Sequence, residues 1–226
     1  MADVKTTTTT VAEEKVELTA KTPVEKYKNV LLILLGAVTI GIAGYFYYQY
    51  TLDESNKEAQ NAIYPAVYFF EQDSLDKALK GDGKVLGLLD VAETFSGTKT
   101  AKLAHFYTGV IYLKQAKFEE AITHLKEFSS SDYLLQARAY SLTGDAYMEL
   151  EKYDDAASYY QKASDYKTNE QFTPVYLMKL ALSYESLKEN KKASDTYDVI
   201  LTKYPKSPEL NDAKKYKARV DALLTE

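Results

Sequence analysis

The stretch YTGVIYLKQAKFEEAITHLKEF, Tyr107–Phe128, is followed 35 residues later by LTGDAYMELEKYDDAASYYQKA, Leu142–Ala163. Both contain a Gly, a Tyr three residues on, a turn-like stretch, an Ala, and a bulky residue four positions after that Ala. A third, looser copy follows, and the equivalent alanines of the three copies are 35 and 37 residues apart. The equivalent positions are Gly109, Gly144 and Ala181, then Tyr112, Tyr147 and Tyr184, then Ala121, Ala156 and Ala193.

This spacing predicts pairs of antiparallel helices that cross closely. A small residue is needed where two helices approach, because a larger side chain would collide with the partner helix. A Tyr three residues later lies on the same helix face and fills the space beside the crossing. One such hairpin cannot bury its apolar face alone, whereas stacked copies can, so the repeats predict an all-α solenoid.

The pattern resembles the tetratricopeptide repeat, in which Gly, Tyr, Ala, a bulky residue and Pro recur with a period of about 34 residues. We expect three tetratricopeptide-like repeats over residues 98–205. The terminal Pro is present only in the third copy, as Pro205. The sequence also departs from the family where Trp is usual, since those positions hold His105, Tyr140 and Leu177.

Composition excludes several kinds of chemistry. The 226-residue chain has a formal net charge of −5, so no basic surface indicates a nucleic-acid partner. It contains no Cys, which excludes disulfides, thiolate metal sites and a Cys nucleophile. The lipid anchor of a bacterial lipoprotein, which needs an N-terminal Cys, is excluded as well.

An N-terminal anchor is predicted from hydropathy. Residues 1–28 are polar and are predicted to be a disordered cytoplasmic tail. The following stretch, Asn29–Tyr50, has no charge from Val30 to Tyr48, and as a helix this uncharged part spans about 28 Å, roughly one hydrocarbon core. Its aromatic end is typical of a membrane interface. We therefore predict an uncleaved transmembrane helix over residues 29–50 rather than a signal peptide, whose leading region is shorter.

The orientation of this anchor follows from the nearby lysines. Lys21, Lys26 and Lys28 precede the apolar stretch, and Lys57 is the lysine that follows it closely. The positive-inside rule then places the N-terminus in the cytoplasm and exports the larger C-terminal part.

The remaining segments are predicted to be helical too. Residues 51–97 read as a degenerate helical pair, whose first helix is kinked or divided at Pro65 and whose two helices are joined by a polar connection. Residues 206–226 read as a capping helix with Ser207 as its N-cap. The stripe that this helix buries is predicted to be Leu210, Ala213, Val220 and Leu224.

No catalytic or ligand-binding motif stands out. His105 and His124 are 19 residues apart on different predicted helices, so packing is favoured over metal ligation. The Gly81–Gly83 sequence GDG lacks the Lys and Ser or Thr of a phosphate-binding loop. We expect no enzyme activity, cofactor, metal, small-molecule substrate or nucleic acid.

A protein-binding groove is implied by the resemblance to tetratricopeptide repeats, whose first helices line a concave face. A groove of this kind suits an extended or helical client segment. For the first copy, packing of Leu103, Phe106 and Val110 under the preceding helix pair is favoured over exposure in the groove. The family's groove positions, carried over to this sequence, are Leu103, Phe106, Val110, Leu113, Arg138, Ser141, Asp145, Met148, Val175, Met178 and Leu182.

The whole layout is similar to the YfgM-like ancillary subunits of the bacterial SecYEG translocon, of the Bacteroidetes type. The resemblance covers residues 25–224 and includes the FSGT turn at Phe95–Thr98. It implies a single-pass inner-membrane protein with a periplasmic repeat domain that binds translocon subunits, exported client proteins or periplasmic chaperones. Two alternatives remain: a tethered scaffold of an envelope assembly or secretion complex, and an organelle import receptor with a cytosolic repeat domain.

Overall fold

The computed structural model describes residues 23–225, and every regular element in this range is an α-helix. The all-helical fold predicted from the sequence is therefore confirmed. The chain falls into two compact units, and the boundary between them lies between Gln49 and Tyr50. Residues 1–22 of the predicted disordered tail lie outside the described residues.

Helix α1, Pro23–Glu71, carries the apolar segment. It begins six residues before the predicted anchor, because Pro23 is well suited to the first turn of a helix. An 18-residue window in α1 has a mean hydropathy of 2.2, and none of its side chains is buried. By length and composition this helix is able to cross a membrane.

The second unit starts with the end of α1, which runs through Pro65 instead of dividing there. Ile63 and Ala66, on either side of this proline, are buried in one apolar cluster with Leu79 and Val91. Packing in this cluster compensates for the backbone hydrogen bond that Pro65 cannot donate. The helix therefore continues to Glu71.

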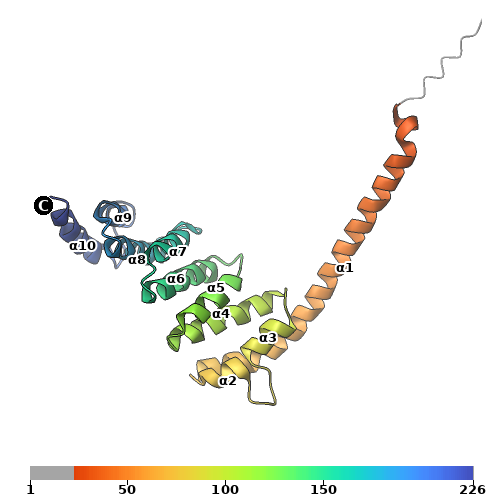
Figure 1. Cartoon of the computed structure of the whole chain (residues 1–226), viewed down its shortest axis with the longest axis horizontal. Helices are drawn as coiled ribbons and strands as arrows, with labels where there is room; N and C mark the ends of the chain where they lie inside the picture. The colour runs from red at the N-terminus through yellow and green to blue at the C-terminus, as the bar shows by residue number, and fades with distance from the viewer. Residues whose placement is uncertain (1–22, 226) are drawn as a thin grey trace, which may run out of the picture. The chain divides into compact units, whose positions relative to one another are not determined.

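Three helical hairpins follow in chain order (Figure 1). The turn inside each hairpin has one residue with positive φ, at Ala116, Glu151 and Lys188. The next backbone N–H donates to the carbonyl of the repeated tyrosine, over 2.8–2.9 Å in all three copies. The paired helices are α4 (Lys99–Lys114) and α5 (Phe118–Glu127), α6 (Tyr133–Glu149) and α7 (Tyr153–Asp165), and α8 (Thr173–Ser186) and α9 (Asn190–Lys203).

The same turn ends α1. Asp73 has positive φ, and the N–H of Ser74 donates to the carbonyl of Phe69 over 2.9 Å. Helix α2, Leu75–Lys80, then begins two residues after the positive-φ residue, as α5 does after Ala116. The end of α1 and α2 thus form a further hairpin of the same kind.

Helix α2 lies where the sequence predicted only a polar connection. The chain leaves α2 at Gly81 and returns at Gly87, where an added Cβ would lie 2.4 Å from the Gly81 nitrogen. Helix α3, Leu88–Thr94, begins at this point of return. We interpret α2 and α3 as two parts of one outer helix, interrupted by the loop visible beside them in Figure 1. The Gly81–Gly83 motif therefore forms the start of this loop.

Close helix crossings hold the repeats together. A Cβ added to Gly109 would lie 2.6 Å from Leu125 Cγ, and one added to Gly144 would lie 2.7 Å from Tyr160 Cε1. In the third copy Ala181 is fully buried. These are the small positions that the repeat pattern assigns to helix crossings.

Helix α10, Leu210–Leu223, packs against α9. Ala213 and Val220 are buried as predicted, whereas Leu224 is 47% exposed. The regular helix begins at Leu210, three residues after the predicted N-cap Ser207. The Leu210 N–H donates a hydrogen bond to the Ser207 carbonyl. Arg219 of α10 pairs with Glu185 of α8, and this ion pair helps to attach α10.

We predict that Gly144→Ala lowers the stability of the full-length protein in detergent. A Gly→Ala change inside a helix ordinarily stabilises by about 1 kcal/mol. Overpacking against the Tyr160 ring costs about 1–3 kcal/mol and should outweigh this gain. Circular dichroism during denaturation would measure the change, with the exposed Ser158→Ala in α7 as control. A stabilised Gly144→Ala protein would contradict the close crossing.

Candidate protein-binding groove

Two adjoining hollows lie along the first helices of the repeats. One, of about 500 Å³, lies between α6 and α8. The other, of about 580 Å³, lies between the start of α4 and the start of α6. Leu135 lines both, and the two hollows together are hereafter called the α4/α6/α8 groove.

The walls of this groove are largely apolar. Leu135 and Leu142 project from α6, while Phe172 and Val175 come from the start of α8. Leu134 at the rim is 37% exposed. The walls therefore offer apolar surface that the chain itself does not cover.

The floor of the α4/α6/α8 groove is a neutralised ion pair. Lys179 Nζ lies 2.7 Å from both carboxylate oxygens of Asp145 and also donates to Ser141 Oγ over 3.3 Å. The Tyr160 hydroxyl donates to Asp145 over 2.6 Å. Burial and then the Asp145 charge raise the pKa of the Tyr160 phenol far above its ordinary value, so Tyr160 stays a donor at neutral pH. These contacts leave Asp145 little capacity to bind a partner.

The groove also contains cations without an acidic partner. Lys99 and Lys102 line its α4 end, and Arg138 lines its α6 wall. Within residues 23–225, none of the three forms an ion pair. The carboxylate of Asp132, likewise without an ion pair in this range, also lines the hollow between α6 and α8, but the three cations outnumber it and make the groove locally positive.

Five of the predicted groove residues line the α4/α6/α8 groove. Leu103 lies at its α4 end, and Arg138, Ser141, Asp145 and Val175 lie between α6 and α8. All five come from the N-terminal parts or the middle of their helices.

Phe106 is placed in the core instead. It is only 6% exposed and packs against Phe128, with ring centroids 5.1 Å apart. Its cluster includes Ala139 of α6, so Phe106 packs toward the next repeat and not under the preceding helix pair. Its side chain is therefore unavailable to a partner.

The other predicted groove residues lie further along their helices and line neither hollow. Val110 is half-buried in the cluster of Phe106. Met148 accepts a hydrogen bond from Ser183 over 3.4 Å, and Leu113 and Met178 pack against the same cluster as Met148. Leu182 is 38% exposed on α8. Contacts between neighbouring repeats occupy most of these side chains.

Sequence reasoning missed several residues of the groove. Those that line it without being predicted include Lys99, Lys102, Leu135, Leu142, Phe172 and Lys179. Lys179 stands one residue after Met178, and its role depends on Asp145, 34 residues away. The sequence signal that could have revealed this pair is the acidic Asp145 in the second repeat together with the basic Lys179 at a nearby position of the third repeat.

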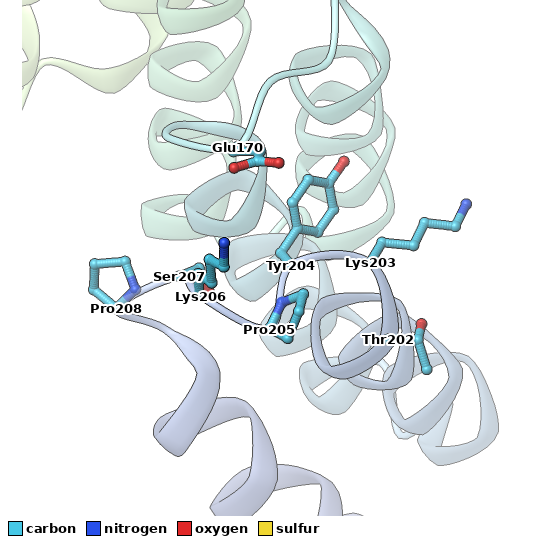
Figure 2. Close-up of a pocket in the computed structure, with 8 residues that line it drawn as sticks. All are labelled: Glu170, Thr202, Lys203, Tyr204, Pro205, Lys206, Ser207 and Pro208. Atoms are coloured by element: carbon cyan, nitrogen blue, oxygen red, sulfur yellow. The ribbon is translucent and has the colours of Figure 1, made fainter.

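A separate hollow of about 330 Å³ lies near the last repeat (Figure 2). Glu170 lies on one side, facing Tyr204, and Pro205 and Pro208 lie in the connection to α10. The charged residues that line this hollow are Glu170, Lys203 and Lys206. In the described part of the chain, no group of three or more His, Cys, Asp or Glu side chains is placed to hold a metal ion.

Comparison with known proteins supports the class of this fold. A model of the tetratricopeptide repeat family matches residues 108–170 and 142–208. No curated protein matches the chain. The helical hairpins over residues 108–208 thus match the tetratricopeptide repeat that their sequence pattern resembles. Proteins with this repeat are typically protein–protein interaction modules.

We predict that Asp145→Ala destabilises the full-length protein more than Tyr160→Phe. Removing Asp145 leaves both the Lys179 ammonium and the buried Tyr160 hydroxyl without their acceptor, at a cost of about 1–3 kcal/mol. Removing only the phenol oxygen costs about 0.5–1.5 kcal/mol. Chemical denaturation in detergent would measure both, with the exposed Asp154→Ala as control. Equal effects of Asp145→Ala and Asp154→Ala would contradict this role for Asp145.

Proposed function

We propose that this protein is a membrane-anchored interaction module that holds a segment of a partner protein in the α4/α6/α8 groove. The observation that carries the proposal is the combination of uncovered apolar walls with three unpaired cations in one groove. Grooves of this kind bind extended or helical segments through apolar anchors and a few polar contacts. The tetratricopeptide-repeat class supports the same general function.

The partner segment should be apolar and should carry carboxylates. Leu135, Leu142 and Val175 offer contact to aliphatic or aromatic side chains. Arg138 and Lys102 offer charge-assisted hydrogen bonds to an acidic group. Because Lys179 is already paired with Asp145, the unpaired cations determine the charge preference.

Membrane anchoring through α1 completes the proposal. The exposed apolar segment of α1 has the length and hydropathy of a transmembrane helix. The lysines before it favour a cytoplasmic N-terminus and an exported repeat domain. For a bacterial protein, this proposal means that the repeats lie in the periplasm, tethered to the inner membrane.

The finer proposal is that the protein acts as an ancillary subunit beside the SecYEG translocon. It would bind exported envelope proteins as they emerge, or pass them to periplasmic chaperones. This rests on the similarity of the layout to YfgM-like subunits. A tethered scaffold of an envelope assembly or secretion complex is the alternative, because an anchored repeat array serves equally well to organise one folded partner.

We predict that the repeat domain is exposed on the outer side of the inner membrane. The chain has no Cys, so Ser158→Cys and Thr8→Cys each introduce a single thiol. A membrane-impermeant maleimide should label Ser158→Cys in cells with a permeabilised outer membrane, and should label Thr8→Cys only after lysis. The opposite labelling pattern would place the repeats in the cytoplasm and contradict the proposed orientation.

We predict that a photo-crosslinking residue at Leu135 captures partner chains in intact cells, whereas one at exposed Ser158 does not. Arg138→Glu should lower the Leu135 yield severalfold by repelling carboxylates, and Lys214→Glu on α10 should leave it unchanged. Mass spectrometry of the adducts identifies the partners. Translocon subunits with many exported proteins support the ancillary subunit, and one stoichiometric assembly partner without the translocon supports the scaffold. Equal yields from Leu135 and Ser158 would contradict the groove.

A further inference from the structure

The only two histidines of the chain meet in the first repeat hairpin. His105 of α4 and His124 of α5 face each other with their Nδ1 atoms 2.9 Å apart and their ring centroids 5.1 Å apart. Both side chains are half-buried. His124 is adjacent in sequence to Leu125, which packs against Gly109, so the histidine contact bridges the two helices beside this close crossing.

The geometry suits a shared hydrogen bond better than a metal ion. The centroid separation exceeds the Nδ1–Nδ1 distance by about twice the distance from the centre of an imidazole ring to one of its nitrogens, so the two nitrogens face each other almost directly. A metal requires both lone pairs to aim at a third point, and a stable site also needs further ligands. No third histidine or carboxylate completes such a group within the described residues.

Proton counting sets the behaviour of the pair. In the neutral state one ring donates its Nδ1–H to the bare Nδ1 of the other. A first proton adds to the Nε2 of the donor ring and leaves this bond intact. A second proton has to occupy the remaining Nδ1, which turns the contact into two opposed donors carrying two positive charges. We propose that His105 and His124 form an acid-sensitive latch, which holds α4 against α5 when neutral and releases them when both rings are protonated.

The surroundings agree with this direction. Burial lowers the pKa of His105, and burial followed by the charge of His105 lowers the pKa of His124. Glu127 of α5 opposes both shifts but does not cancel them. The ring centroids of Tyr112 and His124 lie 5.4 Å apart, and the Lys117 ammonium lies over the Tyr112 ring. Helices α2, α3 and α6 also pack against α4 or α5, and Glu127 is the acidic side chain that acts on both rings.

The sign of the pH effect follows from these lowered values. The unfolded chain binds protons to its histidines at a higher pH than the folded hairpin does, with an unfolded pKa of about 6.5. The stabilisation is therefore fully present above that pH and is lost as the pH falls through it toward the folded values. Helix α4 also carries Leu103 and Lys102 of the groove, so acid should weaken partner capture; that last step rests on the proposed function.

The test uses the full-length protein in detergent without a histidine tag. Because the chain has two histidines, the imidazole Cε1–H signals in NMR belong to these two rings alone. We expect both signals to titrate as a coupled pair below the ordinary midpoint. We also expect the melting temperature to fall by about 2–4 °C more between pH 7.5 and 5.0 than in the double variant His105→Gln, His124→Gln.

Glutamine retains a hydrogen-bonding group but does not titrate, so the double variant isolates the proton. If that variant does not fold, the NMR titration of the unchanged protein still decides the outcome. Two independent titrations at the ordinary midpoint would overturn the latch, as would an unchanged pH dependence in the double variant. Stabilisation by one equivalent of Zn²⁺ at pH 7.5, lost in His105→Gln, would also overturn it in favour of a metal site. Loss of crosslinking at Leu135 without a change in these readouts would concern the groove alone.

Discussion

The close approach of two helices at one small residue per repeat is the constraint on which the rest of this structure depends. Gly109 admits Leu125, Gly144 admits Tyr160, and Ala181 lies fully buried in one cluster with Tyr197. The tyrosines at these crossings also reach outward. Tyr160 donates to Asp145 at the floor of the groove, so the packing of the second hairpin positions the polar floor of the binding surface. Tyr197 donates to Glu185, which in turn pairs with Arg219 of α10.

The repeats could be predicted because their constraint is local. Small residues, tyrosines and alanines recur in phase, and the positive-φ turns at Ala116, Glu151 and Lys188 fall in the same register. Helix α2 was missed because its six residues are followed by the Gly81–Gly87 loop, which hides the continuation of the same outer helix in α3. Sequence periodicity cannot show that a loop leaves a helix and brings the chain back to the same place in space.

The groove was only partly predictable for a related reason. The family positions Arg138, Asp145 and Val175 line the hollow between α6 and α8, because they lie on the first helices of their hairpins. They do not show that Phe106 is buried against Phe128, or that Lys179 neutralises Asp145 across 34 residues of chain. The two histidines illustrate the same limit, since their contact exists only once α4 and α5 are paired. Which residues remain free to bind is decided by tertiary pairing.

We propose that partner segments bind along the first helices of the repeats and that the outer helices support those helices. Hydrogen–deuterium exchange of the full-length protein, isolated from membranes with and without its crosslinked partner, tests this directly. The account predicts added protection at the starts of α4, α6 and α8, together with unchanged exchange in α5, α7 and α9. Protection confined to the outer helices, or to α1 alone, would contradict it.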